Sequence, residues 1–209
     1  MQRSNSTKLV PIAVIIVIVI IVIVAVVSIG RSLFNTTEET KVEEDLNKGR
    51  TALLDLDSGN SVKMSVRGPL VADENFASYN ILVTPGNRTL TVYNGYQDNV
   101  KKRKTLSNNA AAYEEFVYAL DKANYMKGEV PADDEKNDLR GICATGYVYE
   151  YYVLSENEPV KRLWTSTCGG SPGSLEASVE QLNNLYFEQI PDSKTIVPFA
   201  DKSRTRFSF

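Results

Sequence analysis

The chain has 209 residues, a formal charge of −3 and 43% hydrophobic residues, so it is long enough to bury a core but carries no overall positive field. This balance argues against nucleic acid as a partner, because nucleic-acid binding depends on an excess of positive charge. The chain also contains no histidine. That absence excludes nucleophiles activated by histidine and the common zinc sites that histidine helps to build.

The most decisive stretch is residues 9–29, whose sequence is LVPIAVIIVIVIIVIVAVVSI. As an α-helix it extends about 31 Å, which matches the hydrocarbon thickness of a bilayer. A buried core segment is disfavoured by the length of the run and by its lack of charge. A cleaved signal peptide is the stronger alternative, with Val26 and Ser28 at the small-residue positions, but signal-peptide apolar cores typically span only about 7 to 15 residues. We therefore predict an uncleaved transmembrane helix.

The charges around this helix predict its orientation. Arg3 and Lys8 precede the span, whereas Arg31 follows it and is succeeded by acidic residues. Positive charge is retained on the cytoplasmic side of a membrane. We therefore expect residues 1–8 to be a cytoplasmic tail and the rest of the chain to lie outside the cell membrane. Residues 30–60 are typical of a stalk, either a solvated, partly helical spacer or a coiled-coil partner site.

The first half of the exterior part contains three predicted strands and a helix. In residues 61–67, SVKMSVR, apolar and polar side chains alternate as they do in a half-buried strand. Residues 77–84 and 88–93 are predicted to form a hairpin across a Pro-Gly-Asn turn. Residues 105–127 carry apolar side chains at helical spacing and are predicted to be a helix that ends at Gly128.

The second half repeats the order strand, strand, helix after a polar connector at residues 129–139. Residues 142–154 are rich in tyrosine and valine, and residues 159–168 contain the single tryptophan of the chain. We predict that both are strands. Residues 174–189 are predicted to be a helix that is capped by Ser174 and ends before a proline.

Together these elements predict an α+β fold. We expect about five antiparallel strands with two helices packed on one face, in a domain that spans residues 61–191. Residues 192–209 are predicted to be a C-terminal tail.

Both cysteines of the chain fall in the second predicted hairpin. Placing Cys143 opposite Cys168 gives a four-residue loop and a register of favourable cross-strand pairs. Those pairs are Tyr147 with Trp164, Tyr149 with Arg162, Glu150 with Lys161, and Tyr151 with Val160. We therefore predict a cross-strand disulfide, with two free core thiols as the alternative. A disulfide persists in an oxidising space, which agrees with an exterior domain.

Motifs for catalysis are weak in this chain. Residues 169–173, GGSPG, match the G-x-S-x-G pattern of hydrolases, but there is no histidine base, and Pro172 lacks the N–H that the oxyanion hole would need. No Ser-x-x-Lys spacing occurs either. Paired carboxylates are the remaining option, with candidates Asp73, Glu74, Asp133, Asp134, Glu135 and Asp138. The connector acids lack the glycine that a calcium loop requires. We therefore predict a protein that is not an enzyme and that uses no cofactor or metal.

The basic run at residues 101–104 is the main candidate for a binding site. Its ordinary interpretation is a solvated approach to the following helix, and the alternative is a contact with anionic lipid, an envelope polymer or nucleic acid. Exposed aromatic side chains would extend such a surface. The candidate residues are Tyr96, Tyr147, Trp164, Lys101, Lys102, Arg103 and Lys104.

Several strings resemble a known group of proteins. They are RGPLVADENFASY, AAYEEFVYALDKANYMKG, RGICATGYVYEYYVL, LWTSTCGGSPGS and EQIPD, which follow an anchor rich in isoleucine and valine. These strings resemble single-pass, membrane-anchored surface proteins of host-dependent candidate-phylum bacteria of the Saccharibacteria type. The group has no assigned activity, so the resemblance implies a bacterial envelope setting and carries no functional residues.

The sequence thus predicts a single-pass protein whose exterior domain is a binding or structural module of the cell envelope. Its expected partners are the lipid bilayer, through residues 9–29, and an envelope polymer or a surface protein. The alternative function is an envelope enzyme that uses carboxylates, such as a hydrolase acting on glycans. A buried carboxylate in a cleft would favour the enzyme, whereas an exposed flat or aromatic patch would favour the binding module.

Overall fold

The computed structural model describes residues 23, 48–96, 98–130 and 137–199. Contacts divide the chain into Met1–Glu44 and a compact unit, Asp45–Phe209. The predicted transmembrane helix at residues 9–29 lies outside the described residues except for Ile23, as do the predicted cytoplasmic tail and the start of the stalk. Among the described residues, no helix combines the length and the apolar character that a membrane span requires.

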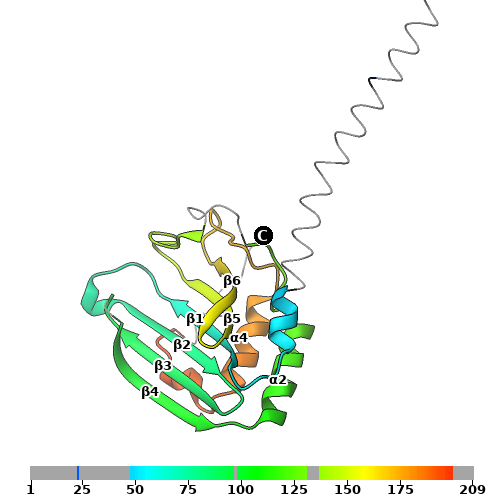
Figure 1. Cartoon of the computed structure of the whole chain (residues 1–209). Helices are drawn as coiled ribbons and strands as arrows, with labels where there is room; N and C mark the ends of the chain where they lie inside the picture. The colour runs from blue at the N-terminus through cyan, green and yellow to red at the C-terminus, as the bar shows by residue number, and fades with distance from the viewer. Residues whose placement is uncertain (1–22, 24–47, 97, 131–136, 200–209) are drawn as a thin grey trace, which may run out of the picture. The chain divides into compact units, whose positions relative to one another are not determined.

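Six strands form one antiparallel sheet (Figure 1). They are β1 Asn60–Arg67, β2 Ala77–Val83, β3 Asn87–Asn94, β4 Asn99–Ser107, β5 Val148–Ser155 and β6 Glu158–Ser166. Their order across the sheet is β4-β3-β2-β1-β5-β6. The predicted α+β class is therefore confirmed, although the sheet has one strand more than expected.

Strand β1 lies in the middle of the sheet because its alternating sequence suits a strand with one buried face. Val62, Met64 and Val66 are almost fully buried, whereas Lys63 and Ser65 on the other face are half-buried. Strands β2 and β3 continue the same buried face through their own apolar residues. All three strands begin and end within one residue of the bounds predicted from the alternation.

Strand β4 is the strand that the sequence did not reveal. The basic run at residues 101–104 belongs to this strand and does not lead directly into a helix. Helix α2 (Ala110–Lys122) begins five residues later than predicted and is capped by the side chain of Asn109, which accepts a hydrogen bond from the backbone N–H of Ala112 (3.0 Å). The physical reason is that a strand at the edge of a sheet is solvated, so charged side chains replace the usual alternation.

The hairpin of β5 and β6 differs from its predicted register. Tyr149 pairs with Thr165, not with Arg162, and Glu150 pairs with Trp164, not with Lys161. The two strands are joined by a two-residue turn in which Glu156 and Asn157 both have positive φ (52° and 70°), as in a type I′ turn. The shift arises because the cysteines, which were used to set the register, both lie outside the paired strands.

The helices cover one face of the sheet. Helix α4 (Val179–Glu188) and α2 lie side by side on this face in Figure 1, and α4 is capped by Ser178, later than the predicted Ser174. Residues 48–54 are also helical and bury Leu53 in the same core. After α5 (Ser193–Ile196), Val197 is buried too, so the core extends beyond residues 61–191 at both ends.

Buried tyrosines connect the helices to the sheet. The hydroxyl groups of Tyr125 and Tyr186 are 2.6 Å apart, and the Tyr125 hydroxyl also donates to the backbone carbonyl of Tyr152 at 3.0 Å. The Tyr151 hydroxyl donates to Oδ1 of Asn183 on α4 at 2.8 Å. These bonds satisfy polar groups that would otherwise cost free energy on burial. The helical layer is thereby fixed in one position on the sheet.

Candidate functional site

The face of the sheet opposite the helices is the candidate functional site, and we call it the open face. It is formed by the alternate residues that point away from α2 and α4. Its main members are Lys63, Ser65, Arg67, Asn80, Thr91, Tyr93, Arg103, Glu150, Tyr152 and Arg162. Most of them are half-buried, because neighbouring side chains on a pleated sheet shield one another.

The open face carries an excess of positive charge. Among its strand residues, four are cations, Lys63, Arg67, Arg103 and Arg162, and one is an acid, Glu150. The chain as a whole has a formal charge of −3. The charge of the open face is therefore opposite in sign to that of the whole protein, which favours contact with anions.

A network of polar side chains occupies the open face over β1, β5 and β6. The Lys63 ammonium lies 4.1 Å from the centroid of the Tyr152 ring, a cation–π contact. The Tyr152 hydroxyl donates to Oε2 of Glu150, and Nη1 of Arg162 lies 3.6 Å from the same oxygen. The network holds the cationic groups in fixed positions before any ligand arrives.

Burial changes the titration of two members of this network. Desolvation lowers the pKa of the Lys63 ammonium, and the nearby Glu150 carboxylate offsets part of this effect. Burial also raises the pKa of the Tyr152 hydroxyl, with the charge of Glu150 as the second cause. Tyr152 therefore stays neutral near pH 7 and acts as a hydrogen-bond donor to Glu150.

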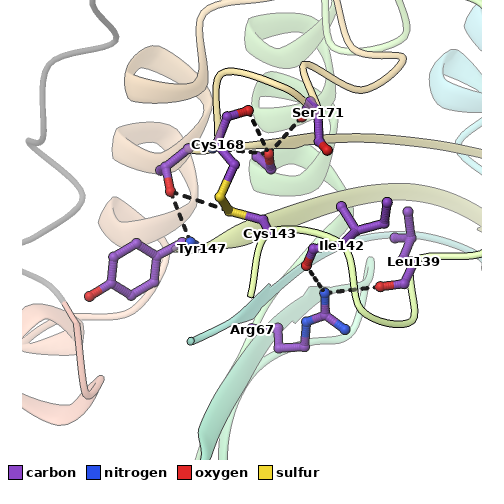
Figure 2. The surroundings of a disulfide bond; sticks show 9 residues. Arg67, Leu139, Ile142, Cys143, Tyr147, Cys168 and Ser171 are labelled. Carbon is purple, nitrogen blue, oxygen red and sulfur yellow. Dashed lines mark hydrogen bonds between the residues drawn. A yellow bond between two sulfur atoms is a disulfide. The ribbon is translucent and has the colours of Figure 1, made fainter. Parts of the chain in front are cut away.

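A loop held by the disulfide borders the open face (Figure 2). The bond joins Cys143 and Cys168 with their Cα atoms 5.4 Å apart, so the predicted pairing is confirmed. Figure 2 shows that Nη2 of Arg67 donates to the backbone carbonyls of Leu139 (3.0 Å) and Ile142 (2.8 Å) in the same loop. Loop residues 139–143 thus cover one end of the open face.

The disulfide is not the cross-strand bond between paired residues that the sequence suggested. Cys143 lies in the loop before β5 with φ of 53°, and Cys168 follows the end of β6. The bond supports a second small core, whose buried members are Leu139, Cys143, Val148 and Trp164. The disulfide therefore connects the loop before β5 to the end of β6, and it does not join paired residues of two strands.

The three predicted aromatic candidates do not form one patch. Trp164 is only 6% exposed in the second core, so its ring is not available at the surface as expected. Tyr147 packs against Phe199, with ring centroids 5.1 Å apart. Tyr96 is 48% exposed and stacks on Phe76 at 4.0 Å in the loop between β3 and β4. Of the aromatic candidates, Tyr96 is therefore the one that shares a hairpin with the basic run.

The basic run is divided between the two faces of β4. Lys102 and Lys104 pair with Val92 and Leu90, so they lie on the helical side, whereas Arg103 pairs with Thr91 on the open face. The Lys104 ammonium donates to the backbone carbonyl of Pro191 at 2.6 Å. Of the three residues of the run that have a register partner on β3, Arg103 is therefore the one on the open face.

Four members of the open face were not among the predicted site residues: Lys63, Glu150, Tyr152 and Arg162. The alternation in residues 61–67 does place Lys63 and Arg67 on one face of a strand, which was the available signal. Their neighbours on β5 and β6 could not be identified, because the predicted register of that hairpin was shifted.

The segment that matches the hydrolase pattern has a structural role. Ser171 accepts a hydrogen bond from the Ser166 hydroxyl through its backbone carbonyl at 2.6 Å. No helix follows it directly, since α4 begins at Val179. Within the described part of the chain, no Asp or Glu is buried, and no cluster of three or more acidic or cysteine side chains could hold a metal ion.

Comparison with known proteins adds no assignment to this site. No protein-family model matches the chain, and no curated protein matches it. A function for the open face has to be argued from its own geometry and charge.

Proposed function

We propose that this chain is a membrane-anchored binding module of the cell envelope, and that its open face holds an anionic envelope polymer. The observation that carries the proposal is the excess of cations on the open face of a chain whose formal charge is negative. The ligand chemistry is a chain of phosphate or carboxylate groups, which arginine and lysine bind through charge-assisted hydrogen bonds.

The spread of the cations favours an extended ligand. Arg103 lies on β4 at one edge, Lys63 and Arg67 lie on β1, and Arg162 lies on β6 at the other edge. Five spacings of about 4.8 Å separate the two edge strands, or roughly 24 Å in all. A single small anion would meet one or two of these groups, whereas a polymer can meet cations on several strands.

Three sequence features support an envelope location. Residues 9–29 are predicted to span the membrane with the N-terminus inside, the strings quoted above are expected to belong to a bacterial surface protein, and the acidic segment after residue 30 suits an exterior stalk. The Cys143–Cys168 bond is consistent with this location, since structural disulfides persist in oxidising compartments. The proposal therefore places the domain outside the cell membrane.

The proposal is tested with the full chain in lipid nanodiscs titrated with poly(glycerol phosphate), using dextran as the neutral polymer. We expect binding of the anionic polymer that weakens with salt and no binding of dextran. Lys63→Met, which keeps the length of the side chain, and Arg103→Gln should each weaken binding about three- to tenfold through the loss of one ionic contact. Lys122→Met, on helix α2, is the matched control and should leave binding unchanged.

Three results would contradict the proposal. Equal binding of dextran would show that charge does not select the ligand. Unchanged affinity in both Lys63→Met and Arg103→Gln would move the site away from the open face. Cleavage of the polymer by the wild-type protein would favour the alternative function, an envelope enzyme.

A further inference from the structure

The two edges of the sheet differ in how they are covered. At β6, the backbone N–H groups of Ser174 and Leu175 both donate to the carbonyl of Trp164, at 2.9 and 3.0 Å, and Ser174 Oγ accepts from the N–H of Trp164 at 3.1 Å. At β4, all nine residues are exposed or half-buried. Within the described residues, β4 is therefore the sheet edge that stays open to another strand.

Strand β4 has backbone groups directed away from the sheet. Asn108 N–H donates to the Gly86 carbonyl at 2.9 Å, at the end of the pairing between β3 and β4. This bond makes Asn108 and Gly86 a hydrogen-bonded pair, and such pairs alternate with non-bonded pairs along an antiparallel ladder. Thr105 and Arg103 therefore belong to non-bonded pairs with β3, and their N–H and C=O groups point away from it. These groups form the row that an added strand would pair with.

The positive charge of the β4 edge disfavours pairing with a basic strand and favours pairing with an acidic one. The run Lys101, Lys102, Arg103 and Lys104 places cations on both faces of β4. A second copy of β4 would bring like charges together and is disfavoured. A strand with acidic side chains would meet opposite charge on both faces.

A rigid apolar patch lies next to the start of β4. The Tyr96 hydroxyl donates to the Val71 carbonyl (2.8 Å) and accepts from the Val71 N–H (3.1 Å), while the backbone N–H of Tyr96 donates to Asp73 (2.7 Å). Val71, Tyr96 and Val100 are each about half exposed. Asp73 and Asp98 lie near this patch and would repel an acidic side chain. The start of β4 therefore suits an apolar residue of a partner.

We propose that the edge of β4 binds an extended acidic segment of a partner protein as a seventh strand. Main-chain hydrogen bonds to the outward groups of β4 supply the pairing, and carboxylates opposite residues 101–104 supply the charge selection. An apolar residue at one end of the segment packs against Tyr96 and Val100. This site overlaps the proposed polymer site at Arg103 and otherwise uses the backbone edge of β4.

The test uses the full chain in nanodiscs and a nine-residue probe peptide in which pairs of glutamates alternate with pairs of valines, with a leucine at one end. Each pair of glutamates places a carboxylate on both faces of the strand. We expect micromolar to millimolar binding and slower amide exchange in residues 101–107. The same peptide with N-methyl groups on alternate amides keeps its charge but cannot complete the ladder, and its affinity should fall at least tenfold.

Two variants at one position separate strand pairing from other effects. Thr105→Pro removes an outward N–H without removing a backbone bond to β3, and it should weaken peptide binding about tenfold. It also removes the bond that the Thr89 hydroxyl donates to the Thr105 hydroxyl (3.2 Å), which Thr105→Val removes equally. Thr105→Val keeps the N–H and should bind the peptide normally. Tyr96→Ala should weaken binding of the leucine-ended peptide but not that of a peptide in which glycine replaces the leucine.

The proposal is overturned if the N-methylated peptide binds as well as the parent, because charge alone would then explain the interaction. It is also overturned if no peptide binds, or if Thr105→Pro binds normally. A loss of peptide binding in Lys63→Met with no loss in Thr105→Pro would instead place the acidic peptide on the open face.

Discussion

Gly173 is a residue whose backbone requires glycine. Its φ is 83°, and a Cβ atom at this position would lie 2.2 Å from the carbonyl oxygen of Trp164 and 2.7 Å from the Cα of Thr165. The close approach lets the following residues cover the edge of β6. A side chain here would force this segment away from the strand.

We predict that Gly173→Ala lowers the free energy of unfolding by about 2 kcal/mol or more, from the positive φ and the contact with backbone atoms together. Gly170→Ala is the matched control, because a Cβ there meets no atom within 4 Å, and it should change the free energy by less than about 0.5 kcal/mol. Urea denaturation followed by circular dichroism measures both. Similar values for the two variants would mean that the covering segment moves freely.

The disulfide loop is the element whose stability depends most on one bond. Cys143 and Cys168 are 25 residues apart, and a closed loop of this length stabilises the folded state by about 3.5 kcal/mol in the chain-entropy model. We predict that the double variant Cys143→Ser, Cys168→Ser loses about this amount. It should also shift Trp164 fluorescence to longer wavelength, since Trp164 packs in the same small core. An unchanged emission spectrum would show that the loop stays packed without the bond.

The elements that could be predicted are those with one buried face. Strands β1, β2 and β3 were predicted nearly to the residue because apolar and polar side chains alternate along them. Strand β4 was missed, since an edge strand with solvated side chains carries no such pattern. The cysteine pairing was predicted correctly, but the register derived from it was wrong, because positive φ at Cys143 places that residue in a loop.

The candidate site was less accessible to sequence reasoning than the fold. Which face of a sheet stays open depends on where helices from distant parts of the chain pack, and Lys63 and Arg162 come from strands about a hundred residues apart. Trp164 was a plausible surface residue by chemistry alone, but the disulfide loop covers it. The basic run was recognised because its four residues are contiguous in the chain.

The whole molecule should respond to pH mainly in the alkaline range. Burial raises the pKa of Tyr149 to about 12, and it raises the pKa values of Tyr125, Tyr151 and Tyr186 as well. A tyrosine is neutral when protonated, and in the unfolded chain it ionises near pH 10. These groups therefore contribute their full stability below about pH 10 and lose it as the pH rises further.

We predict that the free energy of unfolding is nearly constant between pH 6 and 8, where a chain without histidine has few groups to titrate. Above pH 10 it should fall by up to about 1.4 kcal/mol per pH unit for each buried tyrosine. Tyrosinate absorbance near 295 nm should then rise together with unfolding. Ionisation of all eleven tyrosines, the buried ones included, while the protein remains folded would contradict the burial of these hydroxyl groups.

The central position of β1 has a consequence for biosynthesis. One side of β1 is completed at once by β2, but the other side waits for β5, with Met64 pairing with Tyr151. Until the ribosome has synthesised the last third of the polypeptide, β1 is an apolar central strand with one unpaired hydrogen-bonding edge. A nascent chain that ends after α2 would therefore be prone to aggregate through this edge. Binding of a chaperone until β5 emerges would matter more for this protein than for one in which every strand pairs with its neighbour in the chain.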